Sequence, residues 1–212
     1  MSARPVALLL GLVLLAACQS PPHDYTLFRA HRPRSVLVLP PIDATMEVDA
    51  TYAYLSTVTQ PLAERGYYVF PVAVVDRMLR DNGMPGPGEM HAVSLARVRE
   101  VFGADAVLYV TLRDWGTAYR VLDSATEVTA EARLVDTASG QELWSGTHTA
   151  AYSSSSGSGD LVSMLIGAVV NQVASSMYDP SVDVARQCND ELFCNGHDGL
   201  LVGPYHEDWG KE

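Results

Sequence analysis

Two cysteines near the C-terminus have the clearest capacity for chemistry in this chain. Cys188 and Cys194 form an even pair once Cys18 is set aside, and two thiols in an oxidising compartment favour a disulfide. The loop between them is short, so the bond would stabilise this segment by roughly 2 to 2.5 kcal/mol in the chain-entropy model. The alternative is a metal site that adds His197 and His206, but the cysteine spacing is too wide for a usual zinc knuckle. The sequence therefore predicts a disulfide and no metal site.

Catalytic groups are harder to assemble from these residues. A serine hydrolase needs a nucleophile on a G-x-S-x-G elbow with a histidine and an acid to activate it, and the chain has no such elbow. The six histidines are scattered, and His148 falls in a predicted strand, where it is more simply a residue of the sheet face. Residues 84–90 (MPGPGEM) contain glycines, but their prolines lack the N–H donors of a phosphate cradle. The sequence predicts no enzyme and no cofactor.

A third cysteine ends a hydrophobic N-terminal segment. Arg4 supplies a positive charge, and Val6 to Leu15 is an apolar run too short to cross a bilayer. The sequence LAAC ending at Cys18 resembles the bacterial lipobox, whose cysteine receives acyl chains, palmitate among them, and becomes the mature N-terminus. The alternative is an ordinary signal peptide with a chance cysteine. We predict a lipoprotein signal peptide at 1–17 and lipidation of Cys18, and Gln19 resembles the pattern of outer-membrane sorting.

The composition is typical of a folded, acidic protein. Hydrophobic residues make up 48% of the 212 residues, charged residues 18%, and the formal charge is -11, which excludes a disordered chain. Nucleic acids and anionic membrane surfaces attract clusters of lysine and arginine, so this chain is a poor partner for both. Proteins are the expected partners, and the membrane is expected to be reached through the N-terminal acyl chains.

The body of the chain alternates strand and helix patterns after a lipidated tether at 18–34. Apolar, β-branched runs predict strands at 35–41, 67–72 and 106–112. Apolar residues near helical spacing predict helices at 49–65, 74–82 and 94–102. Alternating residues at 127–135, a turn at 136–140 and a returning strand at 143–152 predict an antiparallel hairpin.

An uncharged helix is predicted near the end of the chain. Residues 153–159 (SSSSGSG) form a flexible spacer, and a helix follows from Asp160 to about Tyr178. Its apolar face contains Leu161, Leu165, Ile166, Val169, Val170, Val173 and Met177. This face is expected to pack across the sheet, and the alternative is contact with a second copy or a membrane surface. Residues 179–212 form an acidic tail that is expected to be packed and closed by the disulfide.

These elements predict one domain at 35–178 with an α/β (α+β) fold. The order is β-α-β-α-α-β, followed by the hairpin and a packing helix, in a two-layer or three-layer sandwich with a mixed sheet. The element order and Leu134 to Asp136, Ser139-Gly140 and Trp144 resemble the α/β domain of the TolB N-terminus and of curli-secretion lipoproteins.

Four longer segments resemble a more specific family, the GNA-type lipoproteins, which include a neisserial genome-derived antigen. They are 66–76 (GYYVFPVAVVD), 133–146 (RLVDTASGQELWSG), 168–174 (AVVNQVA) and 200–205 (LLVGPY). The resemblance implies a homodimeric outer-membrane lipoprotein that serves as an auxiliary part of an envelope transport system. Its expected partners are other envelope lipoproteins or transporter subunits. The family offers no catalytic residues to carry over.

Two other functions stay open at this point. A periplasmic ligand-binding module would hold a closed, mostly apolar pocket with a few polar groups. A membrane-inserting oligomer related to curli secretion would use the spacer and the following helix. A protein-contact role would instead expose an apolar surface, either on that helix or in the aromatic tail around Tyr205 and Trp209. The body is expected to face the periplasm, with exposure at the cell surface as the alternative.

Overall fold

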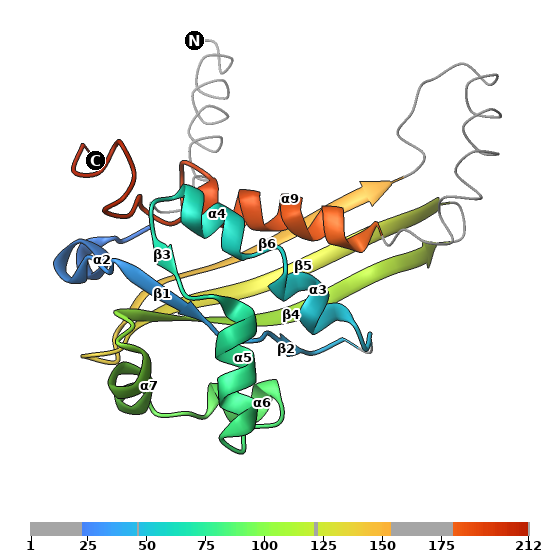
Figure 1. Ribbon diagram of the computed structural model, residues 1–212. Coiled ribbons are helices and arrows are strands. Elements are labelled where there is room, and N and C mark those ends of the chain that lie inside the picture. Colours follow the sequence, from blue (N-terminus) through green and yellow to red (C-terminus); the bar gives the residue numbers. More distant parts are fainter. Residues whose placement is uncertain (1–22, 46, 121–122, 154–179, 212) are drawn as a thin grey trace, which may run out of the picture.

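One mixed sheet organises the structure, a computed structural model that describes residues 23–45, 47–120, 123–153 and 180–211 (Figure 1). Within these residues the sheet has six strands in the order β3-β1-β4-β5-β6, with β2 also paired to β4. The strands are β1 Ser35–Val38, β2 Ile42–Asp43, β3 Tyr68–Val69, β4 Ala106–Arg120, β5 Asp123–Asp136 and β6 Glu142–Ser153. Strand β1 is parallel to β3 and β4, whereas β4, β5 and β6 are antiparallel.

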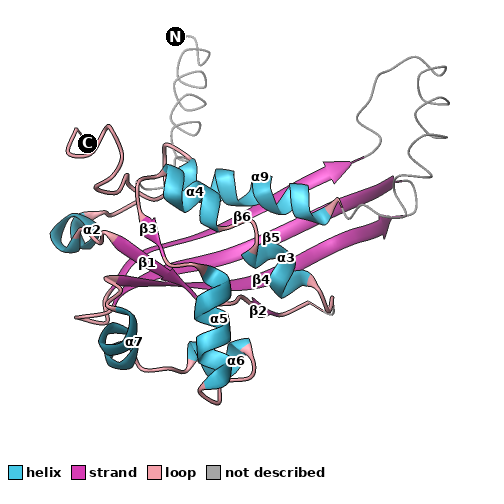
Figure 2. Cartoon of the chain, in the orientation of Figure 1, coloured by secondary structure: helices cyan, strands magenta, loops and turns pink. Residues whose placement is uncertain are grey.

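Helices lie on both faces of the sheet. They are α2 Thr26–His31, α3 Ala50–Leu55, α4 Thr59–Glu64, α5 Val72–Asp81, α6 Pro87–His91, α7 Leu95–Phe102 and α9 Ser181–Cys194. Figure 2 shows α3, α4 and α9 on one face and α5, α6 and α7 on the other. The half of the sheet formed by the parallel strands β3, β1 and β4 therefore has helices on both faces and is three layers thick. This confirms the predicted mixed α/β sandwich.

Side-chain alternation along β4 explains the two layers of core. Leu108, Val110 and Leu112 pack into the cluster beneath α3, α4 and α9. Val107 and Tyr109 point to the opposite face and join the smaller cluster beneath α5, α6 and α7. Because a strand exposes successive side chains to opposite faces, a strand buried on both faces must be apolar at every position, as β4 is from 106 to 110.

The helix predicted at 49–65 is divided into α3 and α4. Pro61 has no N–H to donate to the carbonyl of Thr57, and its ring would clash with that carbonyl in a continuous helix. At the break between the two helices, the Thr57 hydroxyl donates to the carbonyl of Tyr54 at 2.8 Å. Gly66 ends α4 with a φ of 83°, which confirms the predicted stop.

Two other segments differ from the predictions. The predicted loop at 84–90 contains the start of α6, which begins with Pro87 at its first position, where the missing N–H costs nothing. The acidic tail begins with the fourteen-residue helix α9, whose apolar residues, Val184 and Leu192 among them, pack on β5 and β6. The predicted helix at 160–178 lies outside the described residues, and α9 is the helix seen to pack across the antiparallel half of the sheet.

Candidate functional site

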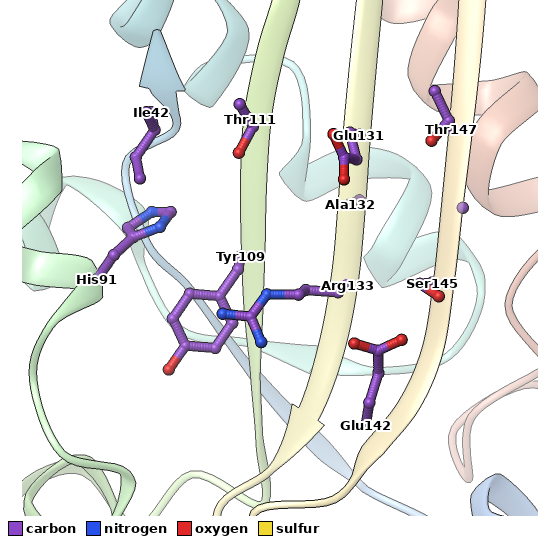
Figure 3. Close-up of a pocket in the computed structure, with 11 residues that line it drawn as sticks. Ile42, His91, Tyr109, Thr111, Glu131, Ala132, Arg133, Glu142, Ser145 and Thr147 are labelled. Carbon is purple, nitrogen blue, oxygen red and sulfur yellow. The ribbon is translucent and has the colours of Figure 1, made fainter. Parts of the chain in front are cut away.

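A groove of about 530 Å³ lies on the face of the antiparallel strands opposite α9. Its floor is formed by side chains of β4, β5 and β6, and Ile42 of β2 and His91 of α6 close one side (Figure 3). The strand alternation that buries Ala132 and Leu134 under α9 places Glu131 and Arg133 on this opposite face. The groove therefore forms because, among the described residues, a helix packs on only one face of the antiparallel half of the sheet.

Arg133 is held over an aromatic ring inside the groove. Its guanidinium carbon lies 4.3 Å from the centroid of the Tyr109 ring, a cation–π contact. The Tyr109 side chain is 7% exposed, and burial raises the pKa of its hydroxyl, an effect that the charge of Arg133 partly opposes. The hydroxyl therefore stays protonated, and the ring gives the arginine a fixed platform.

His91 adds a neutral imidazole beside the same ring. The two ring centroids are 5.2 Å apart in an edge-to-face arrangement. Nε2 of His91 lies 2.9 Å from the carbonyl oxygen of Pro40, and a carbonyl only accepts, so the proton is assigned to Nε2. Burial lowers the pKa of His91, and the positive charge of Arg133 lowers it further, although the bond to Pro40 opposes this. At neutral pH, Nδ1 is therefore an acceptor.

Two carboxylates line the groove, and they differ in their partners. Glu131 is neutralised by Arg113, whose Nε lies 2.8 Å from Oε2. Among the described residues, Glu142 forms no ion pair, and neither does Arg133. The groove thus contains one positive and one negative side chain that form no ion pair with any residue in the described part of the chain.

The arrangement can bind polar groups, but it lacks an activated nucleophile. Ser145 and Thr147 supply hydroxyls on β6, and in the described part of the chain no histidine or carboxylate accepts a hydrogen bond from either of them. Nucleophilic catalysis needs such a base within hydrogen-bond reach. The groove is also open and polar, unlike the closed, mostly apolar pocket expected for the ligand-binding alternative.

Most of the predicted site residues lie outside the described residues. These are the lipidation residue Cys18 and the apolar face at Leu161, Leu165, Ile166, Val169, Val170, Val173 and Met177. In the aromatic tail, Tyr205 is 72% exposed, whereas Trp209 is partly buried with the guanidinium of Arg32 5.7 Å from its ring. None of the helices within the described ranges is long and apolar enough to cross a membrane.

The predicted Cys188–Cys194 disulfide is wrong for this structure. Both residues lie in α9 and both thiols are free. Six residues of α-helix separate two Cα atoms by about 9 Å along the axis, and a disulfide needs them within roughly 7 Å. Over the described ranges, no three His, Cys, Asp or Glu side chains are grouped to hold a metal ion, so His197 and His206 do not join the cysteines.

The two thiols should differ in reactivity. Cys188 is buried, and burial raises the pKa of its thiol to about 11, so on the order of one molecule in 10⁴ is ionised at pH 7. Cys194 is partly exposed, although burial raises its pKa as well. In the full chain carrying Cys18→Ala, we expect a thiol reagent to modify Cys194 at least about tenfold faster than Cys188. When this variant is unfolded without reductant, we expect two thiols to react. If none reacts, the Cys188–Cys194 disulfide is present after all.

Comparisons with known proteins place the chain among bacterial lipoproteins. The model of the family described as "Putative lipoprotein GNA1162-like" matches residues 23–205. A protein named "Putative lipoprotein NMB1124/NMB1162" from Neisseria meningitidis serogroup B is 42% identical over 206 residues, 95% of this chain and 96% of its own. The crystal structure of lipoprotein GNA1162 from Neisseria meningitidis is 45% identical and has a TM-score of 0.55, covering 68% of this chain and 99% of its own.

Proposed function

Because this chain belongs to the family described as "Putative lipoprotein GNA1162-like", we propose that it is an envelope lipoprotein that acts through protein contacts and not as an enzyme. Its anchor is the acylated Cys18 in the outer membrane, and its body faces the periplasm. Its role is that of an accessory or assembly component of an envelope transport or secretion system. The lipobox-like sequence before Cys18 supports the anchor.

The edge strand β6 is the observation that carries the proposed contact role. Strand β6 lies at the end of the sheet, and over the described residues it pairs only with β5. It is twelve residues long, and Thr147, Thr149 and Tyr152 along it are exposed. A long unpaired edge presents backbone N–H and C=O groups that can take up a strand from another chain.

A partner strand on β6 would extend the antiparallel unit β4-β5-β6. We propose that the partner is a second copy of this chain, which gives a homodimer, or a lipoprotein or transporter subunit of the same envelope system. The groove described above is open and polar, so the closed apolar pocket of a ligand carrier is the weaker alternative. Residues 153–178, on which a membrane-inserting oligomer would depend, lie outside the described residues apart from Ser153.

Photo-crosslinking of the full-length lipoprotein in its native envelope tests the contact role. A photo-reactive residue replaces Thr149 on β6 in one variant and Arg77 on α5 in the control, because the Arg77 side chain is 77% exposed but α5 packs on β1, with β4 and β5 between it and the β6 edge. We expect covalent adducts from the Thr149 position and few from the Arg77 position, with mass spectrometry naming the partner. Equal yields from both positions, or none from either, would contradict a contact through β6.

A further inference from the structure

Arg133 and Glu142 are neighbours across β5 and β6 that do not neutralise each other. Val135 pairs with Glu142 and Arg133 with Ser145, with a register shift after Leu134 that places Glu142 at the mouth of the groove. Figure 3 shows the Glu142 carboxylate on the same side of the sheet as the Arg133 guanidinium. Opposite charges on neighbouring strands can pair across a sheet, but the Arg133 guanidinium lies over the Tyr109 ring and forms no ion pair with Glu142.

The Tyr109 ring gives the Arg133 guanidinium a defined position in the groove. A cation–π contact uses the face of a guanidinium, so the N–H groups in its plane remain able to donate hydrogen bonds. Such a fork matches the two oxygens of a carboxylate. Because the ring is already in place, little side-chain entropy is lost when Arg133 binds an anion.

Glu142 determines which anions the groove accepts. A phosphate or a dicarboxylate that reached Arg133 would place its second negative charge beside the Glu142 carboxylate, which is unfavourable. A ligand whose carboxylate is accompanied by an ammonium group would satisfy both side chains. Elsewhere in the groove, Glu131 is neutralised by Arg113, and the neutral acceptor Nδ1 of His91 and the hydroxyls of Thr111 and Ser145 can hydrogen-bond an amide or amine.

We propose that this groove binds a zwitterionic ligand, an amino acid or a short peptide with free ends. Its carboxylate binds the guanidinium of Arg133, and its ammonium group binds the carboxylate of Glu142. A cavity of about 530 Å³ is within the size range of small-molecule sites and leaves room for side chains beyond the two charged ends. This binding activity does not depend on the anchor or on a partner at β6.

The test uses purified full-length lipoprotein in detergent. The probes are the standard amino acids, added singly, and trialanine, with binding followed by thermal shift and then by calorimetry. We expect at least one probe to bind, and its C-terminal amide and its N-acetyl form each to bind at least about tenfold more weakly. If no probe binds the wild-type protein, the proposal is overturned, and Arg133 serves only to cover Tyr109.

Three variants assign the two ends of the ligand. Arg133→Gln removes the group that binds the ligand's carboxylate, so the free-acid ligand and its C-terminal amide should bind this variant equally weakly. Glu142→Gln removes the group that binds the ammonium, so the free-amine ligand and its N-acetyl form should bind that variant equally weakly. Arg77→Gln is the matched control, because this arginine is exposed and paired with Asp81 on α5, outside the groove, and it should leave the affinity unchanged. Affinity that survives both Arg133→Gln and Glu142→Gln would overturn the assignment, and the melting temperature of each variant verifies that it is folded.

Discussion

Trp144→Ala should lower the free energy of unfolding by about 3 to 5 kcal/mol. Trp144 is only 2% exposed, and its ring centroid lies 5.7 Å from that of Phe193. Its Nε1 donates to the carbonyl of Asp198 at 2.8 Å. One side chain thus joins β6, α9 and the segment after α9, and alanine would leave a cavity at this junction and an unpaired carbonyl.

Urea denaturation of the full chain measures this loss, with the slope of the transition verifying that the compactness of the unfolded state is unchanged. Tyr152→Ala is the control on the same strand, because Tyr152 is 61% exposed and its loss should cost less than about 1 kcal/mol. Trp144→Phe should fall between the two, since it keeps most of the apolar contact but loses the hydrogen bond. A loss below about 1.5 kcal/mol for Trp144→Ala would show that α9 is not held to the sheet as described.

The hairpin of β5 and β6 could be predicted from sequence because its physical signal is local. Val128, Ala130 and Leu134 alternate with polar residues and face the core in the structure. The preceding hairpin of β4 and β5 was not predicted, because the pairing shifts register between Leu112 and Asp114 and the alternation of apolar residues is interrupted there. A bulge of this kind redirects side chains without leaving a composition signal.

Helix α9 was missed for a different reason. Its buried residues Val184, Cys188 and Leu192 follow the spacing of one helical face, but acidic residues on the other face give the segment the composition of a polar tail. The two cysteines also resemble a disulfide pair in sequence, which hides the helical spacing of Cys188. Cys188 is a buried core residue of α9, and its position is determined by packing and not by redox chemistry.

The groove could not have been predicted from any single segment. Tyr109 has the pattern of a core residue in an apolar strand, His91 directly follows the predicted loop at 84–90, and Glu142 falls between the predicted turn at 136–140 and the predicted strand at 143–152. Only the pairing of β4 with β5 and of β5 with β6, together with α6 at one side, brings these residues together. The one signal present in the sequence is Arg133 on the polar face of an alternating strand, which predicts exposure but not a partner.

Cys18→Ala is expected to move essentially all of the protein from the outer-membrane fraction to the soluble periplasmic fraction. The thiol is the only group at this position that can carry the acyl-bearing substituent, and alanine has no equivalent atom. Each buried CH₂ contributes about 0.8 kcal/mol, so several acyl chains hold a protein that one chain alone would hold only marginally.

Cys194→Ala is the matched control, because it also removes one thiol but leaves the lipobox-like sequence intact, and it should not change the distribution of the protein between fractions. Washing the membranes with high salt and with urea separates acyl anchoring from surface adsorption, because the acidic chain has no electrostatic attraction to an anionic leaflet. Cys18→Ala protein that stays with the membrane through both washes would require a second attachment. Crosslinks from β6 that persist in the released protein would show that the anchor supplies location and that the sheet edge supplies the contact.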